Sequence, residues 1–144
     1  MSEKRHDFHS LAWRAGNAFV ALLARLGVGP IHLLTTTGHR TGREATVPVV
    51  PVDDGDRRWL VAPYGEVQWV RNVRSTDRVE MRYGRTSRRY RAHEAAPTEA
   101  GPVLKRYVAI APKARPEFDA TVDDPVEAFV AEADRHPVFE LLAA

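Results

Sequence analysis

The chain has 144 residues, 44% of them hydrophobic, which is enough for one domain with a core of its own, and a formal net charge of +2. It has no cysteine, which excludes disulfides, thiol nucleophiles and thiolate metal sites. Three of the 21 basic residues are lysine, so 18 are arginine, and eight of these lie between Arg71 and Arg91. The planar guanidinium group of arginine can bind phosphate or carboxylate through two hydrogen bonds, which suggests an anionic ligand or nucleic acid. A solvent-exposed sheet surface rich in arginine would explain the same composition.

Apolar residues recur at helical spacing from Leu11 to Leu26, before Gly27 and Gly29 end the pattern. They predict an amphipathic helix within residues 1–29. Charged residues interrupt this segment, so it is typical of neither a signal peptide nor a membrane span, and we expect a cytoplasmic protein. Its apolar face is interpreted first as packing on the core or on a second copy in a homodimer; peripheral contact with a membrane is a weaker alternative.

Residues 31–37 and 45–52 predict two strands, and the two prolines of the second favour an edge or a bulge. The turn sequence DDGD at 53–56 predicts a hairpin that leads into a third strand at 57–64. The segment EVQWVRNVRS, residues 66–75, brings its apolar side chains onto helical neighbours and predicts a short helix.

Alternating residues at 77–83 and 85–94 predict a second hairpin. Residues 97–135 contain two helix starts, each at a proline, and form a predicted helical segment. The sequence HPVFELL, residues 136–142, predicts a closing strand. Five or six strands in successive hairpins predict a small antiparallel barrel with peripheral helices, in a single domain over 1–144.

The loop GHRTGRE, residues 38–44, combines flexible glycines with cationic and hydroxyl donors. Glycine lets backbone N–H groups approach an anion, while Arg40 and Arg43 add forked donors and Thr41 adds a hydroxyl. This set suits a phosphodiester or a carboxylate tail. Polar Gly/Arg turns are also common at hairpin ends without a ligand, and the loop lacks the spacing of a P-loop or a Rossmann turn.

Several motifs in order resemble the deazaflavin-dependent nitroreductase family: LLTTTGHRTGREATVPV at 33–49, a DGDR hairpin, an AxxG loop at 62–65 and QWVRNVR at 68–74. The resemblance covers about 30–94 and extends to the terminal HPVF. It implies a split β-barrel, antiparallel, mainly β with peripheral helices and related to FMN-binding barrels. It also implies the 8-hydroxy-5-deazaflavin coenzyme F420, whose tail carries a phosphodiester and several glutamate carboxylates.

The resemblance also implies cofactor-binding positions. The anionic tail would be held by loop residues, which here are His39, Arg40, Thr41, Gly42 and Arg43. The ring system would lie beside the following strand and the next loop, at Thr46, Pro48, Val49, Ala62 and Gly65. Further positions on the short helix are Trp69, Arg71 and Asn72.

The activity implied is that of an oxidoreductase which transfers a hydride from reduced coenzyme F420 to a small electron-poor acceptor: a quinone, an enone or a nitroaromatic. Tyr64 and Tyr107 are candidate proton donors, although a hydrogen-bonded buried tyrosine is the commoner role. Trp69 on a short helix is likewise more often a core anchor than a cofactor contact. The histidines show no metal-ligand spacing, and we expect no metal site.

Two further interpretations remain open from the residues. The same barrel and phosphate site would suit FMN in a split-barrel oxidoreductase. Alternatively, the protein binds deazaflavin without catalysis, or binds nucleic acid through the arginines of 82–91, with tyrosines that stack on bases. The low net charge disfavours a dedicated nucleic-acid binder.

Overall fold

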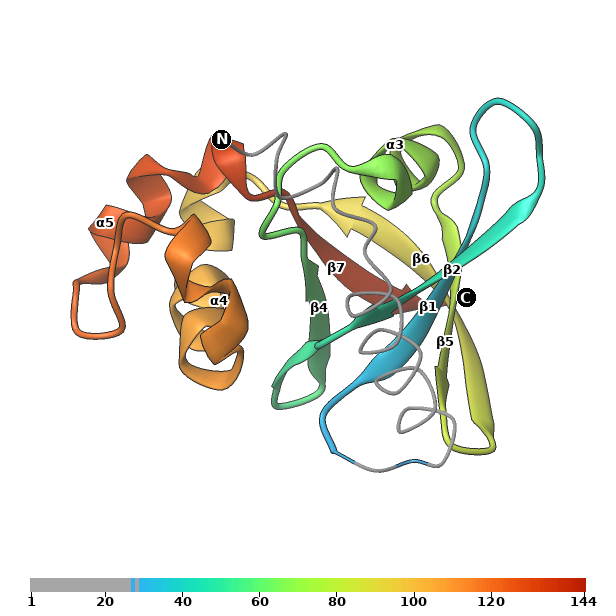
Figure 1. The fold of residues 1–144 in the computed structure, drawn as a ribbon, viewed down its shortest axis with the longest axis horizontal. Helices are drawn as coiled ribbons and strands as arrows, with labels where there is room; N and C mark the ends of the chain where they lie inside the picture. The colour runs from blue at the N-terminus through green and yellow to red at the C-terminus, as the bar shows by residue number, and fades with distance from the viewer. Residues whose placement is uncertain (1–26, 28) are drawn as a thin grey trace, which may run out of the picture.

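Seven antiparallel strands form one curled sheet in the part of the chain that the computed structural model describes, residues 27 and 29–144 (Figure 1). Their order across the sheet is β2-β1-β5-β6-β7-β4-β3. The bounds are β1 (His32–Thr37), β2 (Glu44–Val49), β3 (Val52–Asp54), β4 (Arg57–Val61), β5 (Arg78–Tyr83), β6 (Thr86–Glu94) and β7 (Val138–Ala143). The predicted hairpins and closing strand are confirmed.

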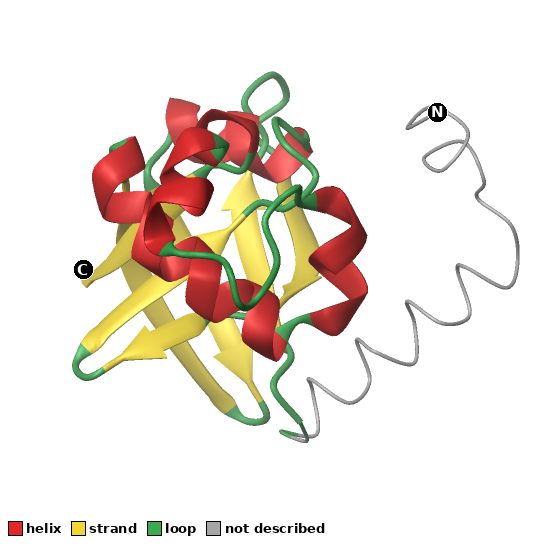
Figure 2. Ribbon diagram, turned by 90° about the vertical axis from the view of Figure 1, so that its left-hand side faces the viewer, coloured by secondary structure: helices red, strands yellow, loops and turns green. Residues whose placement is uncertain are grey.

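Helices gather mainly on one side of this sheet (Figure 2). They are α3 (Gln68–Ser75), α4 (Pro97–Ile110), η1 (Pro112–Glu117), α5 (Val126–Ala131) and η2 (Ala133–Arg135). We call residues 97–135 the helical lobe. The helix predicted within 1–29 lies outside the described residues, apart from Gly27 and Gly29. Across the described stretch, no helix is both long and apolar enough to cross a membrane.

The single strand predicted over 45–52 is wrong, because the structure has two strands there. β2 ends at Val49 and β3 begins at Val52, and the two occupy opposite edges of the sheet. Two residues, Val50 and Pro51, thus connect the two edges, and such a link spans only about 11 Å. The sheet must therefore curl until its edges meet, which produces the half-barrel. The expectation that the prolines favour an edge is confirmed, since Pro48 lies in edge strand β2.

Because side chains alternate between the two faces of a strand, the same strands contribute residues to two separate hydrophobic cores. In β4, Trp59 and Val61 face the helical lobe, whereas Leu60 faces the interior of the curled sheet. In β7, Val138 belongs to the first core and Phe139 to the second. β4 and β7 are therefore a wall shared by the lobe and the barrel, so both are buried on two faces.

Helix α3 lies at one end of the curled sheet and contributes Trp69, Val70 and Val73 to the barrel interior (Figure 1). These residues and Asn72 are the buried residues of the helix, whereas Gln68, Arg71 and Arg74 are exposed. This placement puts α3 next to the two loops in which the sequence analysis predicts cofactor-binding residues.

Candidate functional site

The loop between β1 and β2, residues 38–43, projects beyond α3 (Figure 1). The N–H of Gly38 donates to the carbonyl of Arg43 at 2.6 Å, and the N–H of Gly42 donates to the carbonyl of Gly38 at 3.0 Å. Gly42 has a φ of 73°, a conformation that glycine adopts without steric cost. The loop is thus closed by its own backbone, and the side chains of Arg40, Thr41 and Arg43 remain exposed.

Gly38 is needed for a second reason, which is crowding. A Cβ atom at this position would lie 2.9 Å from the carbonyl oxygen of Arg43 and 3.0 Å from Oγ1 of Thr41. A side chain at residue 38 would therefore push apart the hydrogen bonds that close the loop.

Asn72 of α3 is hydrogen-bonded to the start of the β1–β2 loop. Its side chain is 1% exposed, and its Oδ1 accepts a hydrogen bond from the backbone N–H of His39 at 3.0 Å. Its Nδ2 donates to Oγ1 of Thr36 at 3.0 Å, and Nε2 of Gln68 donates to Oδ1 at 3.2 Å. Because a buried amide without partners is costly, these bonds tie the loop, α3 and β1 together.

The ring of His39 has one tautomer that fits its neighbours. Its Nδ1 lies 2.9 Å from Oδ1 of Asn72, an acceptor, so Nδ1 carries a hydrogen. Nε2 of Gln68 is 3.1 Å from the same Nδ1, but two donors do not bond, so its bond to Asn72 is the consistent one. The arrangement leaves Nε2 of His39 as the ring atom that can meet a ligand.

The guanidinium groups of the loop have no carboxylate partner within residues 27 and 29–144. This holds for Arg40 and Arg43, and also for Arg71 on α3, which is exposed. Arg74, on the same helix, instead bonds Glu94 at 2.7 Å. Two forked guanidinium groups and a hydroxyl are donors of the kind that a phosphodiester with carboxylates requires, so the loop fits such a tail.

The first turn of α3 adds to this positive character. No side chain of the described residues caps the helix at Val67, and its first turn holds no acidic residue. The first backbone N–H groups therefore stay available, and the helix dipole favours an anion there.

A second loop, residues 62–67, runs from β4 to α3. The N–H of Gly65 donates to the carbonyl of Ala62 at 3.3 Å, and the N–H of Val67 donates to the carbonyl of Gly65 at 2.8 Å. Gly65 has a φ of 88°, which favours glycine. Ala62 is fully buried, so the exposed surface of this loop consists mainly of Tyr64 and the residues beside it.

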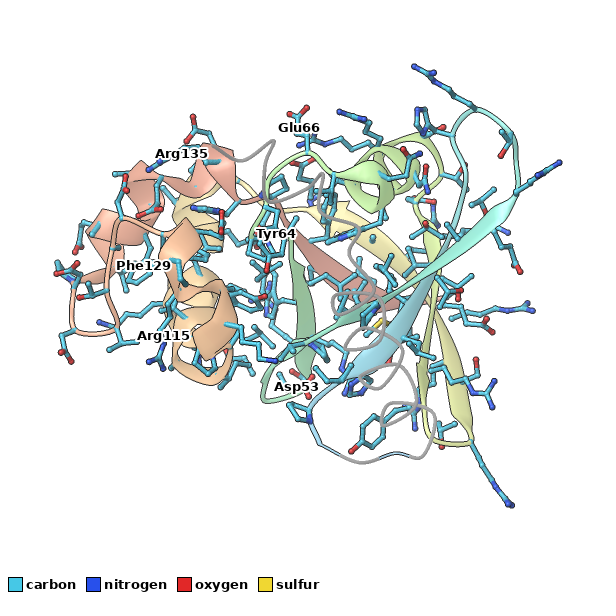
Figure 3. The ribbon with its side chains drawn as sticks, in the orientation of Figure 1. Asp53, Tyr64, Glu66, Arg115, Phe129 and Arg135 are labelled. Carbon is cyan, nitrogen blue, oxygen red and sulfur yellow. The ribbon has the colours of Figure 1, made fainter. Side chains whose placement is uncertain are left out.

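Tyr64 and Tyr107 lie close together where the helical lobe meets the sheet. Tyr64 is 50% exposed and sits at this junction (Figure 3), whereas Tyr107 of α4 is 6% exposed and its ring centroid is 6.3 Å from that of Phe118. Burial, and then the nearby Tyr64, raise the pKa of Tyr107 well above its usual value. Tyr107 therefore keeps its proton at any physiological pH.

Glu132 and His136 form a buried pair beneath the second loop, and each residue is 3% exposed. Nε2 of His136 donates to the Glu132 carboxylate at 2.8 Å, and Nδ1 donates to the carbonyl of Pro63 at 2.9 Å. Burial alone would raise the pKa of Glu132, but hydrogen bonds from the Ala120 N–H, from His136 and from the Asp119 N–H outweigh it and lower that pKa.

The predicted residues of β2 do not share one face. Oγ1 of Thr46 is 2.8 Å from Oγ1 of Thr35 on the outside of the sheet, whereas Val49 packs against the barrel core. Alternation puts Pro48 on the side of Thr46. Only one of these faces can border a ring system.

Trp69 lies inside the barrel. It is 8% exposed, and its ring centroid is 5.8 Å from that of Phe139. This placement agrees with the interpretation of Trp69 as a core anchor of α3.

The structure therefore brings the loop residues 39–43 together with Asn72 and the start of α3. Two cavities, of about 640 and 590 Å³, lie inside the curled sheet and on its outer face, and neither is lined by the loops 38–43 or 62–65. The candidate site is an open surface of two loops and a helix. Residues 27 and 29–144 contain no group of three metal-ligating side chains.

Four residues of this site escaped the sequence analysis: Thr36, Gln68, Glu132 and His136. Gln68 precedes Asn72 by four residues, and Glu132 precedes His136 by four. The first spacing brings two polar side chains onto one face of α3, and the second brings them together across the 3-10 helix η2; these spacings were the available signal.

The family model described as F420H(2)-dependent quinone reductase matches residues 9–133. A comparison with curated proteins found no match. Among solved structures, an "F420-H2 Dependent Reductase" is 24% identical and has a TM-score of 0.54, covering 78% of this chain and 93% of that one. A "domain-swapped dimer" is 21% identical with a TM-score of 0.57, covering 90% and 97%.

A FAD-binding protein from Mesorhizobium loti is 16% identical with a TM-score of 0.51, covering 86% of this chain and 89% of that chain. At such identities these likenesses concern the fold. They confirm the predicted split β-barrel with peripheral helices.

Proposed function

Since the chain belongs to the F420H(2)-dependent quinone reductase family, and is therefore an oxidoreductase that uses coenzyme F420, we propose that it reduces a small, planar, electron-poor acceptor. The acceptor classes are quinones, enones and nitroaromatics. When bound, the reduced coenzyme supplies a hydride from carbon, and the protein mainly binds and orients the two reactants.

The observation that carries this proposal is the backbone-closed loop, whose cations have no carboxylate partner among the described residues. Arg40 and Arg43 would bind the phosphodiester and carboxylates of the tail, with Thr41 as a further donor; Nε2 of His39 would join them where the ring carries a hydrogen on both nitrogens. The bonds from Asn72 hold this loop in place before the coenzyme arrives, which reduces the entropy lost on binding. Arg71 is exposed on the adjacent helix and would reach the same anionic groups.

The ring system would lie over the second loop and the start of α3. Gly65 allows a close approach of the backbone, and Tyr64 offers an exposed aromatic surface for the acceptor. In β2, the face with Thr46 and Pro48 is favoured, because Val49 is already occupied by core packing. Ala62 and Trp69 would support the pocket from within the core.

Proton supply is assigned to Tyr64 rather than to its neighbour Tyr107. Tyr64 is half exposed and can exchange its proton with solvent, whereas the raised pKa of the buried Tyr107 disfavours its ionised form. A Tyr64→Phe variant should lower turnover while leaving coenzyme affinity unchanged.

The experiment that tests the proposal begins with fluorescence titrations of the purified protein with oxidised coenzyme F420 and, separately, with FMN. The Arg40→Ala/Arg43→Ala variant should bind the deazaflavin roughly 10–100-fold more weakly and with a smaller salt dependence. Arg85→Ala/Arg88→Ala, which removes two exposed arginines from the β5–β6 hairpin, is the matched control and should bind normally.

Oxidation of the reduced coenzyme is then followed with a quinone, an enone and a nitroaromatic. Turnover of at least one class supports the proposal. Preference for FMN would place the chain with the flavin enzymes, and coenzyme binding without turnover would leave a non-catalytic binding protein. Affinity for single-stranded nucleic acid that the control variant abolishes would favour the basic strands instead.

A homodimer is part of the proposal, because barrels of this kind often pair. Light scattering of the purified protein decides it. A mass near 16.1 kDa would mean a monomer and would contradict this part alone.

A further inference from the structure

Two hydrogen bonds join the residues before β7 to the second loop. The N–H of Ala62 donates to the carbonyl of Pro137 at 2.8 Å, and Nδ1 of His136 donates to the carbonyl of Pro63 at 2.9 Å. The loop also passes close to residue 135, since a Cβ atom built on Gly65 would lie 3.6 Å from the carbonyl oxygen of Arg135. Hydrogen bonds at residues 62 and 63 thus attach the loop to the residues at the end of the helical lobe.

The geometry defines the protonation of His136. The carbonyl of Pro63 faces one ring nitrogen and the Glu132 carboxylate faces the other, and both partners are acceptors. Both oxygens of Glu132 also accept backbone N–H groups, from Asp119 at 3.1 Å and from Ala120 at 2.8 Å, so this carboxylate is ionised. Both nitrogens of His136 must therefore carry hydrogens, and the ring is an imidazolium.

Glu132 connects this ring to the rest of the lobe. Its bonds to residues 119 and 120 anchor the turn after η1, and the His136 ring stacks on Phe118 with a centroid distance of 3.9 Å. The other charged group that faces Glu132 is Arg135, at 3.6 Å, and Arg135 pairs more closely with Asp119 at 2.7 Å. Glu132 is thus the counter-charge of His136.

We propose that His136 is a positioning residue: through its hydrogen bond to the Pro63 carbonyl it fixes the 62–65 loop at which the coenzyme ring and the acceptor meet. Proline has no N–H, so this carbonyl is the only backbone polar group by which residue 63 can be held. The next residue is Tyr64, whose exposed ring takes its direction from this backbone. The inference rests on the proposed function, because that function places the ring over this loop.

Two substitutions separate the two bonds of His136. The amide nitrogen of asparagine stands as many bonds from Cα as Nδ1, so His136→Asn keeps a donor for Pro63 and loses Glu132. The amide nitrogen of glutamine reaches the position of Nε2, so His136→Gln keeps the Glu132 bond and loses Pro63. Both variants lose the stack on Phe118 equally.

In His136→Gln, the amides of Gly65 and Val67 should exchange with deuterium roughly tenfold faster or more in the coenzyme-free protein. Its kcat should fall roughly 10–100-fold, because a misplaced reactant loses alignment, while the affinity for coenzyme F420 stays nearly unchanged since the tail loop lies elsewhere. His136→Asn should keep both the exchange protection and kcat. It should nevertheless have the lower melting temperature, because the buried Glu132 carboxylate loses the hydrogen bond from residue 136 that glutamine still supplies.

A positioning role is supported if His136→Gln has the higher melting temperature but the lower kcat of the two variants, and His136→Asn has the lower melting temperature but the higher kcat. If both lose kcat in proportion to their loss of melting temperature, the role is structural and the inference is wrong. Nitrogen-15 NMR of the wild-type protein is independent of both variants: a His136 ring without a hydrogen on Nδ1 would also overturn the inference, because such a ring cannot donate to the carbonyl of Pro63. If the wild type reduces no acceptor, the proposed function fails, while exchange and NMR still decide what holds the loop.

Discussion

Oδ1 of Asn72 lies 3.0 Å from the backbone nitrogen of His39, so one buried amide joins α3 to the first residues of the β1–β2 loop. The same side chain reaches Thr36 in β1 at 3.0 Å. The position of this loop, where we propose that the coenzyme tail binds, is thereby coupled to the packing of the barrel, because α3 is held by Val70 and Val73 inside the curled sheet.

Asn72→Ala should destabilise the protein by about 1–3 kcal/mol, since the N–H of His39 and the hydroxyl of Thr36 lose a partner in a buried setting. Coenzyme affinity should fall as well, because the loop is no longer preordered. Urea unfolding and fluorescence titration measure the two effects. Gln68→Ala, which removes an exposed partner of the same amide, is the control and should change both quantities much less. Unaltered affinity in Asn72→Ala would show that the loop does not depend on α3.

Gly38→Ala should weaken coenzyme binding by forcing the loop open, because its Cβ would lie 2.9 Å from the Arg43 carbonyl. The comparison is Gly55→Ala in the β3–β4 hairpin, where φ is 65° and the space around a Cβ is open. Each variant should lose about 1–2 kcal/mol of stability, from crowding in one and from the left-handed backbone in the other. Only Gly38→Ala should lose coenzyme affinity. A similar loss in Gly55→Ala would mean that affinity follows global stability.

Gly101→Ala should destabilise the helical lobe by about 1–3 kcal/mol through overpacking between α4 and α5. A Cβ at this position would lie 2.4 Å from Cγ2 of Val130 and 3.3 Å from Cγ1 of Val126. Adding Val130→Ala removes the closest clash and should restore part of the stability, a non-additivity that a double-mutant cycle measures. Purely additive losses would contradict direct crowding between these two residues.

Stability should fall in acid through Glu132 and Glu140. Burial opposes ionisation of Glu132, but its hydrogen bonds prevail and lower its pKa; Arg57 lowers the pKa of Glu140 through hydrogen bonds at 2.7 and 2.9 Å. Both groups bind protons more weakly when folded, so their contribution is present above the unfolded value of about pH 4.3 and is lost as pH drops through the folded values. Urea unfolding from pH 7 to pH 3 should show this decline. Glu140→Gln should show a shallower decline, and an identical slope would contradict the assignment.

Much of the fold follows from short-range patterns in the sequence. The DDGD turn predicts the β3–β4 hairpin, and the apolar spacing in 66–75 predicts α3 within two residues of its start. Residues 39–43, the proposed tail-binding residues, are adjacent in sequence, so a local motif was enough to group them. Short-range sequence patterns are thus sufficient to predict the hairpins, the helices and the loop.

The remaining features depend on contacts between distant residues. No sequence signal near Val50 indicates that the chain passes from one edge strand of the sheet to the opposite edge strand, because the apolar run continues through this residue. Strand alternation separates Thr46 from Val49, but which of the two faces meets the barrel core depends on the tertiary contacts of β2. His136 makes two hydrogen bonds. The spacing of four residues to Glu132 is visible in the sequence, but the bond to Pro63 joins residues 73 positions apart and has no sequence signal.

Strand β7 lies between β6 and β4 in the sheet, although it is made after both. During synthesis, the hairpins β1–β2, β3–β4 and β5–β6 can close as soon as each emerges, but β4 and β6 each keep one open edge until residues 138–143 follow. Closure of the barrel therefore waits for contacts of long sequence separation, which form more slowly than local ones. A nascent chain stalled before β7 would present two unpaired strand edges, so it is at this stage that the protein is most exposed to aggregation.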